Sequence, residues 1–338
     1  MSAEPLKTLF HPFDAGVLTP PGEGERVLFL DAQPGFRLPE DFGAELVPVQ
    51  GFRPAFRALE QQGYRVLARA EGEGFDAALV LAGRHRGRNE LYIAEAIERT
   101  RPGALVVVAG SKDDGTASLR KRLGDLLPLE ASLPKHHGLA FWFQRPQDVS
   151  DVTAALRAGN GEQLVEGRFH TAPGMFSFDR IDPASRLLLD SLPNDISGAT
   201  ADFAAGWGFL AAELASRFER ITQLDLYEAD IEALDMARRN LGPRAVPPRF
   251  FWHDLVGEPV GLKYRTIVMN PPFHRSRAAE PEIGQEMIRA AARALQPGGR
   301  LFMVANRQLP YEAVLKAGFD ASGEIARDAT YKVLWARR

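Results

Sequence analysis

Short apolar runs alternate with amphipathic segments along the C-terminal half of the chain. The runs have the length of strands, and the segments between them carry apolar residues at helical spacing. Strands that alternate with helices in this way are typical of an α/β fold with a doubly wound, mostly parallel sheet. The expected elements are strand 199–202, helix 207–217, strand 221–227, helix 231–240, strand 246–252, strand 266–269, helix 281–295 and strand 300–305.

The N-terminal half repeats this pattern. Residues 75–112 and 264–307 each begin with an aromatic residue and a short apolar strand. Each continues through an Arg-bearing loop, an amphipathic helix and a Pro-Gly break into a second apolar strand. Residues 129–145 and 319–338 each suggest two strands that form an antiparallel pair. A repeat that spans roughly half the chain predicts two related domains rather than a solenoid.

The two copies differ in length. Residues 31–75 are fewer than the corresponding residues 202–264, so we expect the first copy to lack one helix and one strand. The stretch 151–163 contains small residues and glycines, which suits a linker. We therefore predict two tandem Rossmann-like domains, a degenerate one at 1–150 and a complete one at 151–338.

Composition narrows the class of protein. The chain has 338 residues, of which 45% are hydrophobic, and a formal net charge of -3, so a nucleic-acid partner requires local basic patches. Because cysteine is absent, disulfides, thiolate nucleophiles and sulfur-bound zinc are excluded. We expect no metal site. There is no run of about 18 apolar residues and no leader-like N-terminus. We expect a soluble, cytoplasmic protein without a membrane partner.

A turn of small residues follows the first expected strand of the C-terminal half. The strand ends in Asp202, and Phe203, Ala204, Gly206 and Gly208 then lead into a helix. Small residues let a ligand approach the backbone, and a helix N-terminus offers free N–H groups to a carboxylate or phosphate. A glycine turn before a helix is more often structural, so this pattern alone is a weak signal.

Acidic residues follow the next two strands. Glu228 is placed to accept hydrogen bonds from two ribose hydroxyls, although it or Asp230 could instead cap the following helix. Asp254 could accept a hydrogen bond from an adenine amino group, and its alternative is a solvated loop acid. Three acids at three successive strand ends, together with the glycine turn, favour an adenosine ligand.

The fourth strand runs into Asn270, Pro271, Pro272 and Phe273. Two prolines end the strand in a fixed, extended shape, and a rigid turn is the structural alternative. An exocyclic amine of a purine is a poor nucleophile because its lone pair is delocalised into the ring. Hydrogen bonds to the Asn270 side-chain oxygen and the Pro271 carbonyl would favour a pyramidal nitrogen aimed at an electrophilic methyl. Phe273 would stack on the base.

Three stretches carry a family resemblance: NPPFH at 270–274 with its downstream helix and PGG, HTAPGMFSFDRIDPASRLLL at 170–189, and VANRQLPY at 304–311. With them the chain resembles class I S-adenosylmethionine-dependent methyltransferases, specifically the bacterial rRNA guanine-N2 methyltransferases of the RsmC/RlmG type. The resemblance implies methyl transfer from S-adenosyl-L-methionine to the N2 amine of one guanine in ribosomal RNA, most simply 16S rRNA. It implies two class I methyltransferase domains, with ribosomal RNA or the small subunit as partner. We also expect a monomer.

The sequence departs from this family at several positions. Ala204 and Ala205 stand where the family has Gly and often Cys, and Glu228 stands where Asp is common. We expect the Ala204 methyl to weaken cofactor binding modestly. In the first half, AGRH at 82–85 replaces NPPF, so we expect the domain at 1–150 to bind no cofactor and to perform no chemistry.

Basic clusters are candidates for RNA contact. His274, Arg275 and Arg277 border the proposed base pocket, whereas the clusters at 84–88 and 135–137 lie in the first half. Each could be a solvated charge run. Our hypothesis is that the inactive half supplies RNA-binding surface.

Other functions stay open at this point. Methylation of a 23S rRNA guanine, a DNA adenine or a protein glutamine uses the same chemistry, and a non-catalytic RNA-binding protein could keep the fold. A nicotinamide-dependent oxidoreductase would need G-x-G-x-x-G, which the turn at 202–208 lacks.

Overall fold

Each half of the chain builds one large sheet. The computed structural model describes residues 4–272 and 281–338. The chain divides into the units Met1–Gly161 and Glu162–Arg338. This division lies inside the expected linker 151–163 but later than the expected boundary after residue 150. The boundary is later because helix α5 (Ser150–Arg157) packs on α3 (Arg86–Arg99) and so belongs to the first unit. Within the described residues, none of the helices combines the length and the apolar character that spanning a membrane requires.

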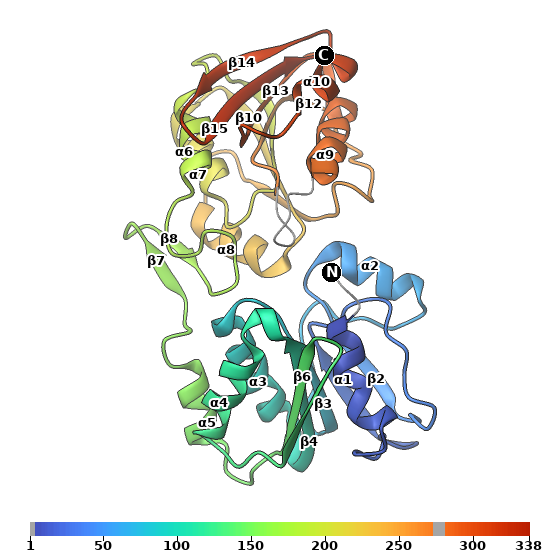
Figure 1. The fold of residues 1–338 in the computed structure, drawn as a ribbon. Coiled ribbons are helices and arrows are strands. Elements are labelled where there is room, and N and C mark those ends of the chain that lie inside the picture. Colours follow the sequence, from blue (N-terminus) through green and yellow to red (C-terminus); the bar gives the residue numbers. More distant parts are fainter. Residues whose placement is uncertain (1–3, 273–280) are drawn as a thin grey trace. The chain divides into compact units, whose positions relative to one another are not determined.

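The C-terminal unit, whose later strands are labelled in Figure 1, holds a seven-stranded sheet. Its strand order is β11-β10-β9-β12-β13-β15-β14. Strands β9 to β13 run parallel and β15 and β14 add an antiparallel pair, which confirms the predicted doubly wound fold. The strands are β9 (Gly198–Phe203), β10 (Ile221–Glu228), β11 (Arg249–Trp252), β12 (Tyr264–Met269), β13 (Leu295–Asn306), β14 (Ala321–Arg327) and β15 (Tyr331–Arg337).

Four elements begin two or more residues away from the expected start. Strand β12 begins at Tyr264 instead of residue 266, and β13 begins at Leu295 instead of residue 300. The other two shifts have local reasons. Strand β11 begins at Arg249 rather than at residue 246, and the prolines at 247 and 248 have no N–H to donate to a ladder. Helix α7 (Phe209–Arg217) begins two residues later than expected, because Gly208 has a φ of 87° and precedes the helix.

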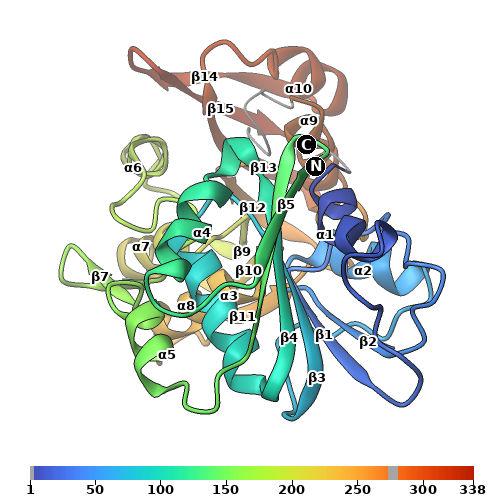
Figure 2. The ribbon, with the colours of Figure 1, turned by 60° about the horizontal axis from the view of Figure 1, so that its bottom comes forward.

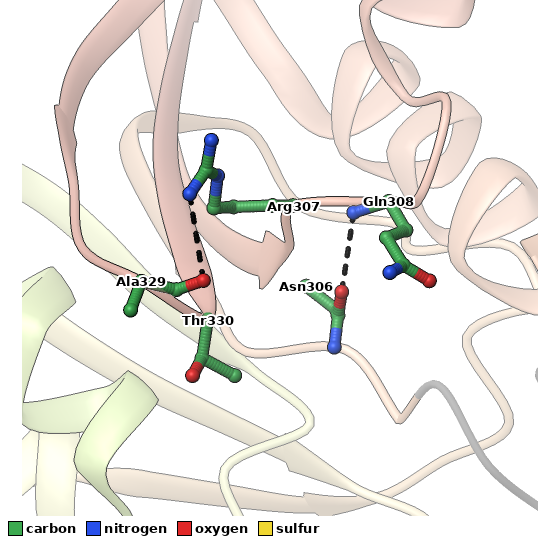
Figure 3. Close-up of a pocket in the computed structure, with 5 residues that line it drawn as sticks. All are labelled: Asn306, Arg307, Gln308, Ala329 and Thr330. Atoms are coloured by element: carbon green, nitrogen blue, oxygen red, sulfur yellow. Dashed lines mark hydrogen bonds between the residues drawn. The ribbon is translucent and has the colours of Figure 1, made fainter.

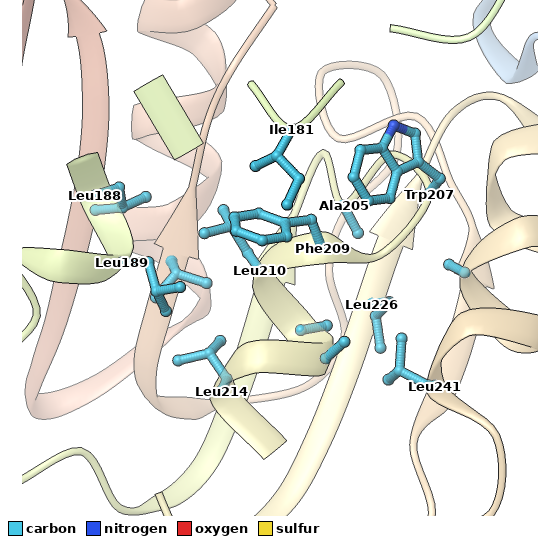
Figure 4. Close-up of a cluster of buried hydrophobic side chains, with 14 of the residues drawn as sticks. Ile181, Leu188, Leu189, Ala205, Trp207, Phe209, Leu210, Leu214, Leu226 and Leu241 are labelled. Atoms are coloured by element: carbon cyan, nitrogen blue, oxygen red, sulfur yellow. The ribbon is translucent and has the colours of Figure 1, made fainter. Parts of the chain in front are cut away.

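Helices cover both faces of this sheet. One core cluster contains side chains from α6 (Pro183–Asp190), α7 and α8 (Ile231–Leu241), and the other contains side chains from α9 (Pro281–Ala294) and α10 (Glu312–Gly318). Figure 4 shows part of the first cluster, in which Ile181, just before α6, and Leu189 of α6 lie near Phe209 and Leu210 of α7. A two-stranded ribbon, β7 (Gln163–Val165) and β8 (Phe169–Thr171), precedes α6.

The N-terminal unit holds a six-stranded sheet in the order β2-β1-β3-β4-β6-β5. In Figure 2, α1 and α2 lie on one side of it, and α3, α4 and α5 lie on the other. Its elements are α1 (Glu4–Asp14), β1 (Arg26–Leu30), β2 (Glu45–Val49), α2 (Arg53–Gln61), β3 (Phe75–Ala82), β4 (Thr100–Ser111), η1 (Lys112–Asp114), α4 (Thr116–Gly124), β5 (Ala131–Lys135) and β6 (Gly138–Gln144).

Strand register confirms the repeat. In the pair β3/β4, Phe75 lies opposite Thr100, and the pairing then shifts. In the pair β12/β13, Tyr264 lies opposite Leu295, with the same shift at the same place. The lost elements are also visible, since the first unit, described from residue 4 onward, has no helix between β1 and β2. Its counterpart of β11 is reduced to a single bridge between Val49 and Leu67.

Candidate active site

Three neighbouring strands of the C-terminal sheet end at the same level. Phe203 of β9 pairs with Tyr227 of β10 on one side and with Met269 of β12 on the other. The residues that follow, Ala204, Glu228 and Asn270, therefore leave the sheet along one edge. Glu228 and Asn270 lie two strand spacings apart, which is about 10 Å. Ligands bind at this edge in open α/β sheets.

The turn after β9 uses its glycines for two purposes. At Gly206, with a φ of 55°, an added Cβ would meet nothing within 4 Å, so a ligand can approach the backbone. At Gly208, an added Cβ would lie 2.9 Å from the Ala237 Cβ and from the Leu241 Cδ1, so this glycine lets α7 pack against α8. Ala204 has a φ of 58°, a left-handed conformation that costs a residue with a Cβ about 1 kcal/mol or more.

Asp202 and Phe203 lie beneath this turn. Both are fully buried. One oxygen of Asp202 accepts a hydrogen bond from the Ala211 N–H at 3.0 Å, which holds the first turn of α7. Burial raises the pKa of this carboxyl well above its usual value, and the Glu228 charge adds to the rise. The Phe203 ring packs edge-on against Tyr227, so only its backbone can face a ligand.

Glu228 joins this turn to the next strand. Its two oxygens accept hydrogen bonds from the Gly206 N–H at 2.7 Å and from the Asp230 N–H at 2.8 Å. Burial raises the pKa of Glu228 to about 7. Asp230, the competing candidate, caps α8 by accepting from the Glu232 N–H at 2.9 Å. Glu228 is therefore the acid at the turn, and Asp230 is the helix cap.

Asp254 shapes the turn that follows β11. One of its oxygens accepts from the Val256 N–H at 3.1 Å and from the Gly257 N–H at 3.0 Å, and its side chain is buried. Its backbone N–H donates to Glu258 at 2.9 Å. The predicted contact with an adenine amino group stays a prediction.

Asn270 is held by side chains that the sequence did not single out. Its Nδ2 donates to the Asp182 Oδ2 at 2.9 Å and to the Ser185 Oγ at 2.8 Å. Pro271 is buried and Pro272 is exposed. The other predicted substrate contacts lie outside the described residues: Phe273, His274, Arg275 and Arg277.

Asp182 and Ser185 carry only a local signal in the sequence. The signal is a helix N-cap pattern, in which Asp182 is followed by Pro183 and, three positions after the acid, by Ser185. In the structure, the Asp182 Oδ2 accepts a hydrogen bond from the Ser185 N–H at 2.8 Å. A cap pattern predicts the start of α6. It contains nothing that points to Asn270.

A polar cavity opens at the end of β13, the neighbour of β12 on the far side from β9. It has a volume of about 440 Å³ and is lined by Asn306, Arg307, Gln308, Ala329 and Thr330 (Figure 3). Asn306 Oδ1 accepts from the Gln308 N–H at 3.1 Å. Among the described residues, the Arg307 guanidinium has only long contacts, to the backbone carbonyls of Asp328 and Ala329 at 3.3 and 3.4 Å. This arginine lies within the motif VANRQLPY.

The N-terminal unit carries different residues at the matching positions. Leu30 of β1 pairs with Val49 and with Val80. By this register Leu81 takes the place of Asn270, so the segment that replaces NPPF begins one residue earlier than 82–85. Gln50 takes the place of Glu228, is buried, and donates to the Ala32 carbonyl at 2.8 Å. The predicted lack of cofactor binding in this unit stays a prediction.

The two basic clusters of the N-terminal unit converge on η1. Arg84 of the cluster 84–88 pairs with Asp114 at 3.3 Å. The His137 carbonyl of the cluster 135–137 accepts from the Lys112 N–H at 3.0 Å. Because η1 directly follows β4, both clusters lie at the edge of the sheet that corresponds to the Asn270 edge of the other unit.

Known proteins resemble this chain. A family model described as the methyltransferase small domain matches residues 166–335. Relatives called ribosomal RNA small subunit methyltransferase C from Escherichia coli strains are 32% identical over 233 residues, which span 68% of this chain and 66% of the relative's length. A solved structure of the T. thermophilus 16S rRNA N2 methyltransferase RsmC, in complex with AdoMet and guanosine, is 25% identical. It matches with a TM-score of 0.79 over 97% of this chain and 91% of that chain.

Proposed function

Because the chain belongs to the methyltransferase small domain family, we propose that its C-terminal unit transfers a methyl group from S-adenosylmethionine to the N2 amine of a guanine in small-subunit ribosomal RNA. One observation carries the proposal: both hydrogens of the Asn270 amide are directed at α6. The side-chain oxygen is thereby left to accept a hydrogen bond from a substrate amine. The E. coli relatives and the T. thermophilus structure support the choice of RNA and of guanine.

The turn after β9 and the end of β10 suit the cofactor. When bound, S-adenosylmethionine supplies an electrophilic methyl group, and transfer breaks its C–S bond with the electron pair kept by sulfur. Glu228 has acceptor capacity left for ribose hydroxyls, because each carboxylate oxygen can accept more than one hydrogen bond. Gly206 gives the ligand room at the backbone.

Asn270 and Pro271 act on the other reactant. The Asn270 oxygen and the Pro271 carbonyl accept the two hydrogens of the guanine amine and turn its lone pair toward the methyl carbon. Methylation makes the nitrogen cationic and acidic, and its proton then leaves toward these oxygens or water. The chain supplies position and polarity and forms no covalent intermediate.

RNA contacts extend beyond the target base. Arg307 has no short hydrogen bond among the described residues, so its guanidinium can bind a phosphate next to the base. The target base must leave any helix to reach Asn270. In this proposal the basic clusters of the N-terminal unit bind more distant parts of the RNA. Because the proposed substrate is ribosomal RNA, we also propose that the reaction takes place in the cytoplasm.

The substrate assignment has a direct test. The protein is incubated with methyl-labelled S-adenosylmethionine and, in separate reactions, with small subunits, large subunits, naked rRNA, DNA and release factor. We expect label in 16S rRNA, as N2-methylguanine at one position mapped by mass spectrometry. Label only in DNA, in protein or in 23S rRNA would contradict the proposal, as would no transfer to any of these substrates.

The Asn270 role predicts a specific kinetic defect. Replacement of Asn270 by Ala should lower kcat by about 100-fold or more, because removal of one preorganised polar group costs rates of that order. Cofactor affinity, measured by calorimetry, should stay within about threefold, since Glu228 and the glycine turn are intact. Asn194→Ala, at an exposed position of the same unit, is the matched control and should keep full activity.

A further inference from the structure

The amide orientation of Asn270 follows from what surrounds it. An ionised carboxylate can accept hydrogen bonds but cannot donate them. The group 2.9 Å from the Asp182 Oδ2 therefore has to be the NH2 of Asn270 and not its oxygen. The Ser185 Oγ takes the second hydrogen at 2.8 Å. A rotation of the amide by 180° would bring its oxygen against the carboxylate oxygen and replace an attraction with a repulsion.

Asp182 and Ser185 are themselves fixed. The same Asp182 oxygen caps α6 through the Ser185 N–H at 2.8 Å, and Pro183 begins the helix with a preset φ. Next to the cap, Ile181 is buried in the cluster that holds α6 against α7 (Figure 4). One carboxylate oxygen thus has two partners, the backbone of its own helix and the side chain of Asn270.

We propose that Asp182 and Ser185 are positioning residues for methyl transfer, which orient the Asn270 amide so that its oxygen faces the substrate amine. The proposal rests on the function proposed above. Without these partners the Asn270 amide would rotate, and its NH2, instead of its oxygen, would face the N2 amine of the guanine. The Asp182 charge also polarises the amide, which makes the Asn270 oxygen a stronger acceptor as positive charge develops on the guanine nitrogen.

Two substitutions separate this role from helix stability. Ser185→Ala removes the hydroxyl but keeps the backbone N–H that the cap uses, and alanine favours a helix. Asp182→Asn keeps a good N-cap residue and removes the charge. We expect kcat to fall by about 10-fold in each variant and by about 100-fold in the double variant. The Kd for cofactor and the KM for RNA should change by less than about threefold.

Two controls accompany these variants. Ser191→Ala, at the other end of α6, removes a hydroxyl that donates to the Leu187 carbonyl at 2.7 Å and should leave kcat unchanged. In the Asn270→Ala background, Ser185→Ala and Asp182→Asn should cause no further loss of kcat, because the group that they position is gone. Wild-type kcat in folded Ser185→Ala and Asp182→Asn proteins, or full additivity with Asn270→Ala, would overturn the proposal.

A second measurement does not depend on activity. In ¹H–¹⁵N NMR spectra, the side-chain amide of Asn270, assigned by its loss in Asn270→Ala, should show two hydrogens that exchange slowly with solvent. Ser185→Ala and Asp182→Asn should each accelerate the exchange. An inactive wild-type protein with a protected amide would reject the proposed function and leave the positioning contact standing. Rapid exchange in the wild-type protein would reject the contact itself.

Discussion

At the scale of single residues, the Glu228 carboxyl makes the proposed cofactor site sensitive to pH. Burial raises its pKa to about 7 in the free protein, while an unfolded chain has an ordinary glutamate pKa. Between those two values the folded state binds more protons than the unfolded state. The contribution of Glu228 to stability therefore falls as the pH rises from about 4.5 to about 7.

Cofactor binding should show the opposite trend. Ribose hydroxyls donate to the ionised carboxylate and lower its pKa, so binding releases a proton below about pH 7. We expect the Kd for S-adenosylmethionine to be about 10-fold higher at pH 6 than at pH 8, which means weaker binding at pH 6. Titration calorimetry in buffers of different ionisation enthalpy measures both the affinity and the released proton.

The variant Glu228→Gln tests whether the Glu228 carboxyl causes the pH dependence of cofactor binding. This variant should bind the cofactor about 10- to 100-fold more weakly at pH 8 and lose most of the pH dependence, because a neutral amide replaces a charged acceptor. Glu219→Gln, at an exposed position in the same unit, should behave as the wild-type protein does. An unchanged pH profile in Glu228→Gln would assign the titration to another group.

At the scale of elements, two glycines in one turn serve different partners. Gly208→Ala places a methyl 2.9 Å from α8 at a φ of 87°, so we expect a loss of about 1–3 kcal/mol in the free energy of unfolding. In Gly206→Ala the new methyl meets open space, and the φ of 55° should cost about 1 kcal/mol in the free energy of unfolding. The same methyl occupies the path of the ligand, so cofactor binding should weaken about 10-fold or more.

Chemical denaturation and calorimetry separate the two variants. The expected pattern is a lower midpoint with nearly normal cofactor affinity in folded Gly208→Ala, and a nearly normal midpoint with weak binding in Gly206→Ala. The reverse pattern would place the ligand at Gly208 and refute this division of roles.

At the scale of the whole molecule, the chain carries two versions of one sheet and only one with the proposed chemistry. The N-terminal version keeps the register but lacks the amide of Asn270 and the carboxylate of Glu228, because Leu81 and Gln50 stand in their places. It keeps basic residues at the matching edge. A retained edge of this kind is consistent with RNA binding.

Charge removal tests this role while keeping the full chain. Arg84→Gln combined with Lys135→Gln should weaken RNA binding about 10-fold at low salt, and reduce the slope of log affinity against log salt by about one for each lost phosphate contact. Cofactor affinity should stay unchanged. Arg120→Gln with Lys121→Gln, two exposed positions on α4, removes the same charge and should have little effect. Equal losses in both double variants would indicate a nonspecific charge effect.

The sequence by itself determined the repeat, the strand and helix order and the residues at the strand ends. These features are local, because hydrophobic periodicity, proline breaks and small-residue turns depend on neighbours along the chain. The alternation at 199–305 therefore predicted a doubly wound sheet, and NPPF predicted a held-out amide at the end of β12. Where local chemistry was misjudged, as at the start of β11, the displacement was only a few residues.

Only the tertiary structure decided which groups meet. Asn270 contacts Asp182 and Ser185, which lie 88 and 85 positions away along the chain. Strand pairing sets Asn270 level with Glu228, and helix packing brings the cap of α6 to the amide. Such contacts depend on register and on the packing of distant segments, for which one sequence contains no local pattern. The amino acids at the site were therefore readable from the chain, whereas the direction of the Asn270 amide followed only from the fold.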